Sequence, residues 1–133
     1  DKLMNGWFRT GDICEIKGGK VYLIGRSDNQ INVGGFKVQA EVLEEIVKQL
    51  NSVKDCICIK SKSKIFGESI TCVVELKEIN NKDNFLANIK NKFKNYPNYY
   101  KPEEFIFEKI RFTENGKKIR QLKLYKNESS NNS

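Results

Sequence analysis

This sequence of 133 residues contains no histidine, and its four cysteines lack the Cys-x-x-Cys spacing of a structural zinc site. Because no histidine can complete a ligand set, we expect no metal site. Cys56 and Cys58 lie two positions apart in a strand-like run, so they are expected to share a buried face as small apolar residues. Free thiols indicate a reducing compartment, and we expect a cytoplasmic protein.

The sequence also lacks an apolar run long enough to span a bilayer. It begins Asp1-Lys2-Leu3, without an initiator methionine or a signal peptide. At this length the chain can form one domain but not two full ones. We therefore expect a C-terminal fragment of a larger soluble protein.

Acidic residues are fewer than basic ones, 17 against 24, which leaves a net charge of +7. This excess is compatible with nucleic acid, with a polyanionic ligand or with a solvated lysine-rich surface. Lys90, Lys92 and Lys94 precede an aromatic loop at residues 96–100, and basic residues interleaved with aromatic ones are typical of single-strand binding. A non-catalytic basic module that binds RNA or an acidic partner is therefore one hypothesis for the function.

Two glycine pairs predict two β-hairpins. Apolar and polar residues alternate over 13–17 and 20–25 around Gly18-Gly19, and a shorter apolar hairpin turns at Gly34-Gly35. Paired glycines supply the positive φ angles that such turns need. Residues 25–29, the joint segment, are polar and link the hairpins, which predicts a joint that absorbs backbone rotation at little cost.

The rest of the chain predicts two helices and three strands. Residues 40–50 carry an apolar stripe of Val42, Leu43, Ile46, Val47 and Leu50, so we expect a core-facing helix with Glu41, Glu44 and Glu45 outside and no chemical role. A helix over 83–95 is expected to begin at Asp83 as N-cap and to bury Phe85, Leu86, Ile89 and Phe93.

Strands are expected over 53–61, 69–78 and 105–110, with a turn at 61–68. The first two are apolar on both faces, so a layer must cover each side. The order β-β, α, β, β, α, β predicts an α+β domain, in which a sheet of about three strands packs against helices after the two hairpins. The polar residues 127–133 have nothing to bury and are expected to be disordered.

Three motifs carry a family resemblance. They read GWFRTGD at 6–12, GRSDNQINVGGFKV at 25–38 and TENGKKIR at 113–120. The second resembles the Gly-Arg-x-Asp-x-Gln-Ile-Lys-x-x-Gly hinge motif of the adenylate-forming enzymes, which include acyl-CoA synthetases and carrier-protein adenylation domains. All three lie in the family's order and are spread over residues 6–120, which is most of the chain. Asn32, where the family has lysine, Ala40, where it has proline, and Val42, where a glutamate is common, depart from its pattern.

The resemblance implies specific roles. Lys117 matches the catalytic lysine of the last motif, and Arg120 its trailing arginine, whereas Lys118 and Lys123 are expected to belong to a solvated basic tail. Asp12, Arg26 and Lys37 would bind the nucleotide, with the Asp12 carboxylate on the ribose hydroxyls. Asp28 would be the hinge. Gly34, Gly35 and Phe36 would line the tunnel for the thiol substrate.

The resemblance also implies an AMP-forming carboxylic acid:CoA ligase that uses ATP, Mg2+ and coenzyme A. Residues 1–27 would end an N-terminal adenylation domain, and residues 28–126 would form a mobile lid that rotates against it. Mg2+ would be bound mainly by that N-terminal domain, and the isolated fragment is expected to be inactive. A carrier-protein-loading enzyme of the same superfamily is the alternative; we expect no membrane partner and no nucleic acid.

Overall fold

The computed structural model describes residues 12–63 and 67–125. Most of the motif at residues 6–12 and the tail at 127–133, expected to be disordered, lie outside the described residues. In the described part no helix is both long enough and apolar enough to cross a membrane.

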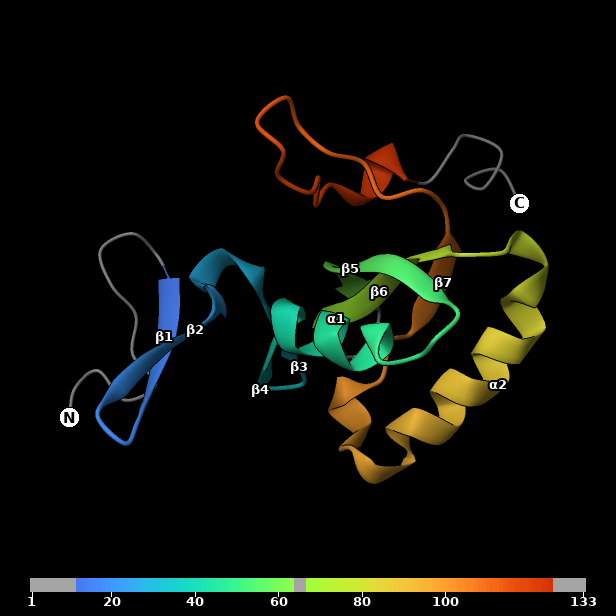
Figure 1. Ribbon diagram of the computed structural model, residues 1–133. Helices are drawn as coiled ribbons and strands as arrows, with labels where there is room; N and C mark the ends of the chain where they lie inside the picture. The colour runs from blue at the N-terminus through green and yellow to red at the C-terminus, as the bar shows by residue number, and fades with distance from the viewer. Residues whose placement is uncertain (1–11, 64–66, 126–133) are drawn as a thin grey trace.

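Both predicted hairpins are confirmed. Strands β1 (Asp12–Lys17) and β2 (Lys20–Arg26) form a two-stranded antiparallel sheet, and β3 (Gln30–Val33) pairs with β4 (Phe36–Gln39). Positive φ angles at Gly18, Gly19, Gly34 and Gly35 close the two turns. Between the hairpins lies the one-turn 3-10 helix η1 (Ser27–Asn29). Figure 1 shows β1 and β2 standing apart from the rest of the described chain.

The main sheet has five strands in the described residues, in place of the expected three. Strands β5 (Val53–Ser63) and β6 (Gly67–Leu76) are antiparallel, and β7 (Glu104–Phe107) runs parallel to β6. The β3–β4 hairpin joins them through the pairing of Val33 with Gly67. The turn expected over 61–68 is wrong at both ends, because the ladder continues to Ser63 and resumes at Gly67.

Helix α1 (Ala40–Lys48) matches its prediction, and α2 (Lys82–Lys92) continues into the 3-10 helix η3 (Phe93–Asn95). Phe85, Ile89 and Phe93 are buried as expected. Leu86 is 40% exposed, because the i, i+4, i+8 row that begins at Phe85 makes the core contact. Asp83 is not the N-cap, since the helix begins one residue before it with Asn81 in the cap position.

A hydrophobic layer covers each face of β5 and β6, as their sequence requires. On one face, Cys56, Cys58 and Cys72 pack with α1 and α2, and Phe85 lies edge-on to Phe105 and Phe107. The other face is covered by the C-terminal segment after β7, with Ile57, Ile59, Val73, Ile110 and Tyr125 in its core. Figure 1 shows this segment across the sheet from the helices. The second covering layer is thus an irregular segment and not a helix.

Candidate functional site

Lys117 lies in a tight turn at residues 113–117, the lysine loop. The Thr113 amide donates to the Lys117 carbonyl at 2.7 Å, and the Gly116 amide donates to the Thr113 carbonyl at 2.9 Å. Gly116 has φ +84°, a conformation that L side chains rarely adopt. The Lys117 side chain is exposed, and no carboxylate of residues 12–63 and 67–125 pairs with it. Its backbone is therefore fixed while its ammonium is open to an anionic ligand.

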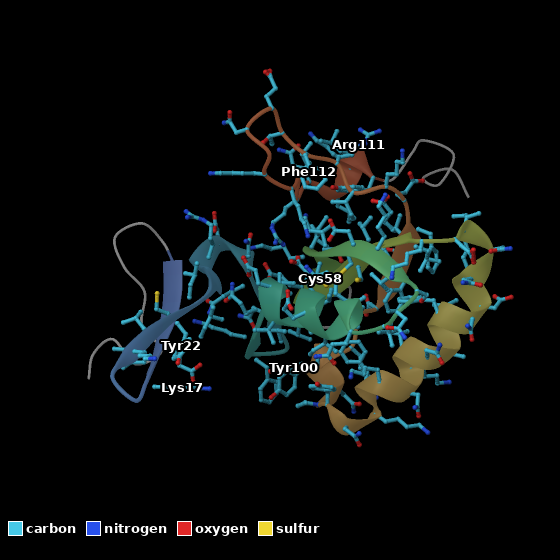
Figure 2. The ribbon with its side chains drawn as sticks, viewed as in Figure 1. Lys17, Tyr22, Cys58, Tyr100, Arg111 and Phe112 are labelled. Carbon is cyan, nitrogen blue, oxygen red and sulfur yellow. The ribbon has the colours of Figure 1, made fainter. Side chains whose placement is uncertain are left out.

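The two chain segments that flank the lysine loop are held to each other. The Tyr125 hydroxyl accepts from the Arg111 amide at 3.0 Å and donates to the Ile119 carbonyl at 2.8 Å, and the Ile119 amide donates to the Arg111 carbonyl at 2.8 Å. Burial raises the pKa of Tyr125, against the effect of its bond with Arg111. Figure 2 shows Arg111 and Phe112 on this segment, across the strand that carries Cys58. Hydrogen bonds thus hold together the two segments that flank the loop, and we call these segments the base of the lysine loop.

Lys118 and Arg120 connect the base of the lysine loop to the sheet and to α1. The Lys118 ammonium lies 2.7 Å from Asp55 Oδ1 and also donates to the Cys56 carbonyl at 3.3 Å. The expectation that Lys118 belongs to a solvated tail is therefore wrong. Arg120 donates to both carboxylate oxygens of Glu44, at 2.8 and 3.2 Å. These contacts anchor the segment that carries the lysine loop to secondary structure that lies 62 to 76 residues earlier in the sequence.

Glu44 corrects the expectation that the acidic residues of α1 lie outside. Its side chain is buried, and its carboxylate accepts from the Cys58 amide at 2.8 Å as well as from Arg120. Burial raises the pKa of Glu44, while the hydrogen bond and charge of Arg120 oppose that rise. Helical periodicity places Glu44 beside the apolar stripe, but it does not reveal a partner elsewhere in the chain.

Glu41 is a second residue that the sequence argument missed, since it was expected to be exposed without a role. Its half-buried carboxylate accepts from the Asn29 side-chain amide at 2.7 Å, from the Gln39 side-chain amide at 2.6 Å and from the Arg26 backbone amide at 3.3 Å. The i, i+3 spacing of Glu41 and Glu44 places both on one side of α1. This spacing is the one signal in the sequence that could have drawn attention to the pair.

The glycine loop, residues 34–36, lies on the other hairpin. The Asn32 side-chain oxygen accepts from the Gly35 amide at 3.0 Å, and the Phe36 ring stacks on Tyr99 with centroids 4.2 Å apart and planes 5° apart. Tyr99 in turn packs against the core that α1 and α2 share. The exposed Phe36 side chain is thus held in place by its contact with Tyr99. The lysine loop, by contrast, belongs to the layer on the opposite face of the sheet.

The residues expected to bind a nucleotide are divided between two hairpins. Asp12 lies opposite Arg26 in the register of β1 and β2, and Lys37 lies on β4, opposite Asn32. Arg26 Nε is 3.6 Å from the exposed Asp28 carboxylate. The structure therefore brings Asp12 and Arg26 to one strand pair, next to the joint segment, and places Lys37 beside the glycine loop.

The cysteines are free and buried. Cys58 and Cys72 face each other across β5 and β6 with sulfur atoms 3.6 Å apart. Hydrogen bonds with Cys56 and Cys58, together with burial, hold the pKa of Cys72 well above its ordinary value. Within the described residues, no three histidine, cysteine, aspartate or glutamate side chains are grouped so that they could hold a metal ion.

Comparison with known sequences gives related enzymes, although no family model matches the chain. It is 30% identical over 122 residues to an acyl-CoA synthetase of Alternaria alternata, covering 89% of this chain and 22% of the relative. A 4-chlorobenzoate–CoA ligase of an Arthrobacter species is 36% identical over 78 residues, 58% of this chain and 15% of the ligase. A D-alanine–D-alanyl carrier protein ligase of Staphylococcus aureus is 30% identical over 113 residues, 83% of this chain and 23% of that ligase.

Solved structures agree with these relatives. A fatty acyl CoA synthetase of Mycobacterium tuberculosis matches 91% of this chain and 24% of its own, with a TM-score of 0.69 and 26% identity. An ATP-bound RpMatB-BxBclM chimera matches 90% of this chain and 24% of its own, with a TM-score of 0.75 and 27% identity. The chain thus spans less than a quarter of the length of these proteins. It belongs to the adenylate-forming enzymes that include the acyl-CoA synthetases and CoA ligases, and its small α+β fold is consistent with a C-terminal domain of that superfamily.

Proposed function

We propose that this chain is the mobile C-terminal part of an enzyme that activates a carboxylic acid with MgATP. In the first half-reaction the carboxylate attacks the α-phosphate, giving an acyl-adenylate and pyrophosphate. In the second, a thiol displaces AMP and leaves a thioester. The observation that carries the proposal is the exposed Lys117 on a turn with an anchored base, in a chain whose relatives are acyl-CoA synthetases and CoA ligases.

Lys117 is the residue that we assign to the first half-reaction. The attacking carboxylate and the α-phosphate are both anionic, so a cation between them lowers the barrier to their approach. The lysine loop suits that role, because its backbone is fixed and its ammonium is not paired with a carboxylate of the described residues. Losing such a preorganised donor costs about 10²- to 10³-fold in rate.

The nucleotide would be bound from the joint side. Asp12 would accept from the ribose hydroxyls, and Arg26, opposite it in the hairpin, would approach the nucleotide. Lys37 would add a single charge near a phosphate, without the paired hydrogen bonds that arginine makes. As the resemblance implies, Mg2+ would be bound mainly by the N-terminal domain.

We place the domain boundary at Asp28, with residues 1–27 ending the preceding domain and residues 28–126 forming the lid. Val21, Tyr22 and Leu23 on β2 are 55%, 50% and 68% exposed. Successive side chains of a strand point to opposite faces, so β1 and β2 expose apolar surface on both sides. Such surface is expected of a hairpin that belongs to a larger body, here the enzyme's own N-terminal domain. The buried free thiols agree with a cytoplasmic location.

The glycine loop is assigned to the second half-reaction. Gly34 and Gly35 let a substrate chain pass close to the backbone, and Phe36 would form one wall of the thiol tunnel. We favour coenzyme A as the acceptor because the VGGFKV sequence is closer to that of the acyl-CoA ligases. The relative that loads a D-alanyl carrier protein keeps a carrier thiol as the alternative. Because the two loops serve opposite layers of the sheet, rotation at Asp28 would present each in turn.

The basic-module hypothesis is weaker. Tyr96, Tyr99 and Tyr100 all pack against the core that α1 and α2 share, and Tyr96 stacks on Tyr100 with centroids 5.7 Å apart. Aromatic rings that bind single-stranded nucleic acid must offer a free face to each base. Part of the surface of these three rings is already covered by other residues of the protein.

The experiment that tests the proposal uses the full-length enzyme. Pyrophosphate release would be followed with ATP and a panel of carboxylic acids, and thioester formation would be followed separately from preformed acyl-adenylate. We expect Lys117→Ala to slow pyrophosphate release by about 10²- to 10³-fold and to spare the thioester step. Lys123→Ala, which removes another exposed lysine of the same segment, is the control. If both steps survive in Lys117→Ala, the catalytic assignment is wrong.

A further inference from the structure

We propose that Glu41 is a latch that holds the joint segment against α1 and so stabilises one orientation of the lid. The inference rests on the proposed function only in naming the two bodies that the latch connects. Its basis is a set of contacts at one carboxylate.

The Glu41 carboxylate bonds to chain on both sides of the expected pivot. Its Oε2 accepts from the Arg26 backbone amide at 3.3 Å and from the Asn29 side-chain amide at 2.7 Å. Gln39, just before α1, donates to Glu41 Oε1 at 2.6 Å and to the Arg26 carbonyl at 2.7 Å. Both backbone polar groups of Arg26 are thus bonded by side chains at the start of α1.

Gly25 shows how closely this carboxylate packs on the preceding body. A Cβ at this position would overlap Glu41 Oε1 and lie 2.7 Å from Gln39 Nε2, so no side chain fits while the ends of both side chains stay in place. Gly25 is buried, and no left-handed φ is found there. The space at Gly25 is therefore limited by the approach of the Glu41 and Gln39 side-chain ends and not by the shape of the backbone.

Rotation about Asp28 must break the contacts of this set that cross the pivot, which are those with Gly25 and Arg26. Gly25 and Arg26 lie before the pivot in the chain, whereas Gln39 and Glu41 lie after it. A turn of one body against the other moves the Arg26 amide away from the carboxylate. The bonds therefore favour the orientation in which they form, and the rotated orientation must do without them.

The same carboxylate also lies near Arg120, three residues after the lysine loop. Arg120, which is bonded to Glu44, has its Nη2 atom 4.0 Å from Glu41 Oε2. Arg120 belongs to the segment that carries Lys117, so the latch and the base of the lysine loop share one guanidinium. The same guanidinium is bonded to Glu44, one turn further along the helix that carries Glu41. Glu41 is a positioning residue, because it acts on the lid and not on the substrate.

A direct test measures lid orientation in the 133-residue chain, without any catalytic assay. Spin labels would be placed at Lys20→Cys in the β1–β2 turn and Lys90→Cys on α2, two exposed positions, since the native thiols are buried. We expect one narrow distance distribution with Glu41 present and a broad or shifted one in Glu41→Ala. Glu45→Ala removes an exposed carboxylate of the same helix, paired only with Lys48 among the described residues, and should leave the distribution unchanged. An unchanged distribution in Glu41→Ala overturns the latch.

Gly25→Ala is a second variant that tests the same contact from the other side. Its methyl group displaces the end of the Glu41 side chain, so it should broaden the distance distribution as Glu41→Ala does. Adding it to Glu41→Ala should change little more, because the two variants remove one interaction. Fully additive effects would contradict a shared contact, and urea unfolding of each variant identifies any that fails to fold.

In the full-length enzyme the latch predicts that Glu41→Ala slows one half-reaction and not the other. The step that uses the latched orientation should slow by about tenfold in Glu41→Ala, and the other should not slow, because a lost bond to a charged group costs roughly that much. Equal slowing of both steps overturns the latch. Failure of the Lys117→Ala test would refute the proposed function and leave the distance measurement intact as evidence on the latch.

Discussion

At the scale of single residues, the carboxylate of Glu44 is buried, so that water cannot stabilise its charge. Glu44 is 5% exposed, and it receives hydrogen bonds from Arg120 and the Cys58 amide. Taking a carboxylate out of water favours its neutral form, while a guanidinium favours the charged form. Burial dominates at Glu44, so its pKa lies above the ordinary value of 4.5.

This balance gives a pH dependence whose sign can be tested. Between pH 4.5 and the raised pKa, the folded state holds a proton that the unfolded state has released. The contribution of Glu44 to the free energy of unfolding must therefore fall as pH rises through that window. Glu44→Gln cannot ionise and should lack this slope. We expect the stability difference, wild type minus Glu44→Gln, to decrease as pH rises, as measured by urea unfolding at a series of pH values.

The control is Glu45→Gln, which removes an exposed carboxylate of the same helix that pairs with Lys48; a matching decrease in this variant would mean that the slope does not come from Glu44. A difference that increases with pH for Glu44→Gln would mean that Arg120 outweighs burial. The pKa of Glu44 would then lie below its ordinary value.

The same residue shows what the sequence could not provide. Periodicity over residues 40–50 located α1 and most of its apolar stripe, yet it placed Glu44 and Glu41 in solvent. Their partners, Arg120 and the joint segment, lie 76 and 12 to 15 residues away in sequence. Lys118 was misplaced for the same reason, since Asp55 is 63 residues distant. A local sequence pattern indicates which face of a helix is apolar. It does not indicate that a charged residue distant in the sequence will contact that face.

At the scale of elements, the β3–β4 hairpin is the part of the sheet with the fewest ladder contacts. Among the described residues, it joins β6 through one residue pair and through the bond from the Asn32 amide to Glu68 Oε1 at 2.7 Å. The sequence predicted this hairpin but not its attachment, because a single bridge leaves no periodic signal. Element order, both hairpins and the central strands were predicted well, since each has a strong local pattern.

Asn32 is expected to hold the shape of the glycine loop. In Asn32→Ala the Gly35 amide loses its side-chain acceptor, which should cost about 1 kcal/mol or less at this exposed position. Hydrogen exchange at Gly35 and Phe36 should become faster, and the Phe36 ring should stack less firmly on Tyr99. Under the proposed function the thioester step slows while pyrophosphate release does not.

Asn80→Ala, another exposed asparagine, should change neither the exchange of the glycine loop nor the thioester step. Unaltered exchange at Gly35 in Asn32→Ala would show that the loop keeps its shape without this bond. NMR or mass spectrometry of the exchanged amides provides the measurement.

At the scale of the whole molecule, two loops with different expected tasks are supported by the two opposite layers of one sheet. The lysine loop rests on the layer built by Ile110, Ile119 and Tyr125, and the glycine loop rests on Tyr99 and the helical layer. A thin domain of this kind can present either face by rotation without internal rearrangement. The sequence required a cover on both faces of β5 and β6, but it did not show that an irregular segment would supply one of them.

This division of labour predicts that the 133-residue chain alone does not turn over. Adenylation needs an acid pocket, a metal site and groups on the triphosphate, which we assign to the N-terminal domain, whereas the lysine loop offers the exposed Lys117. Without groups that hold both reactants in line, a single cation leaves most of the barrier in place. We expect no pyrophosphate release and no thioester from the chain with ATP, Mg2+, a carboxylic acid and coenzyme A, while the full-length enzyme produces both under the same conditions. Acyl-CoA formation by the chain alone, retained after removal of contaminating ligase and abolished by Lys117→Ala, would contradict this prediction and place the whole site within these residues.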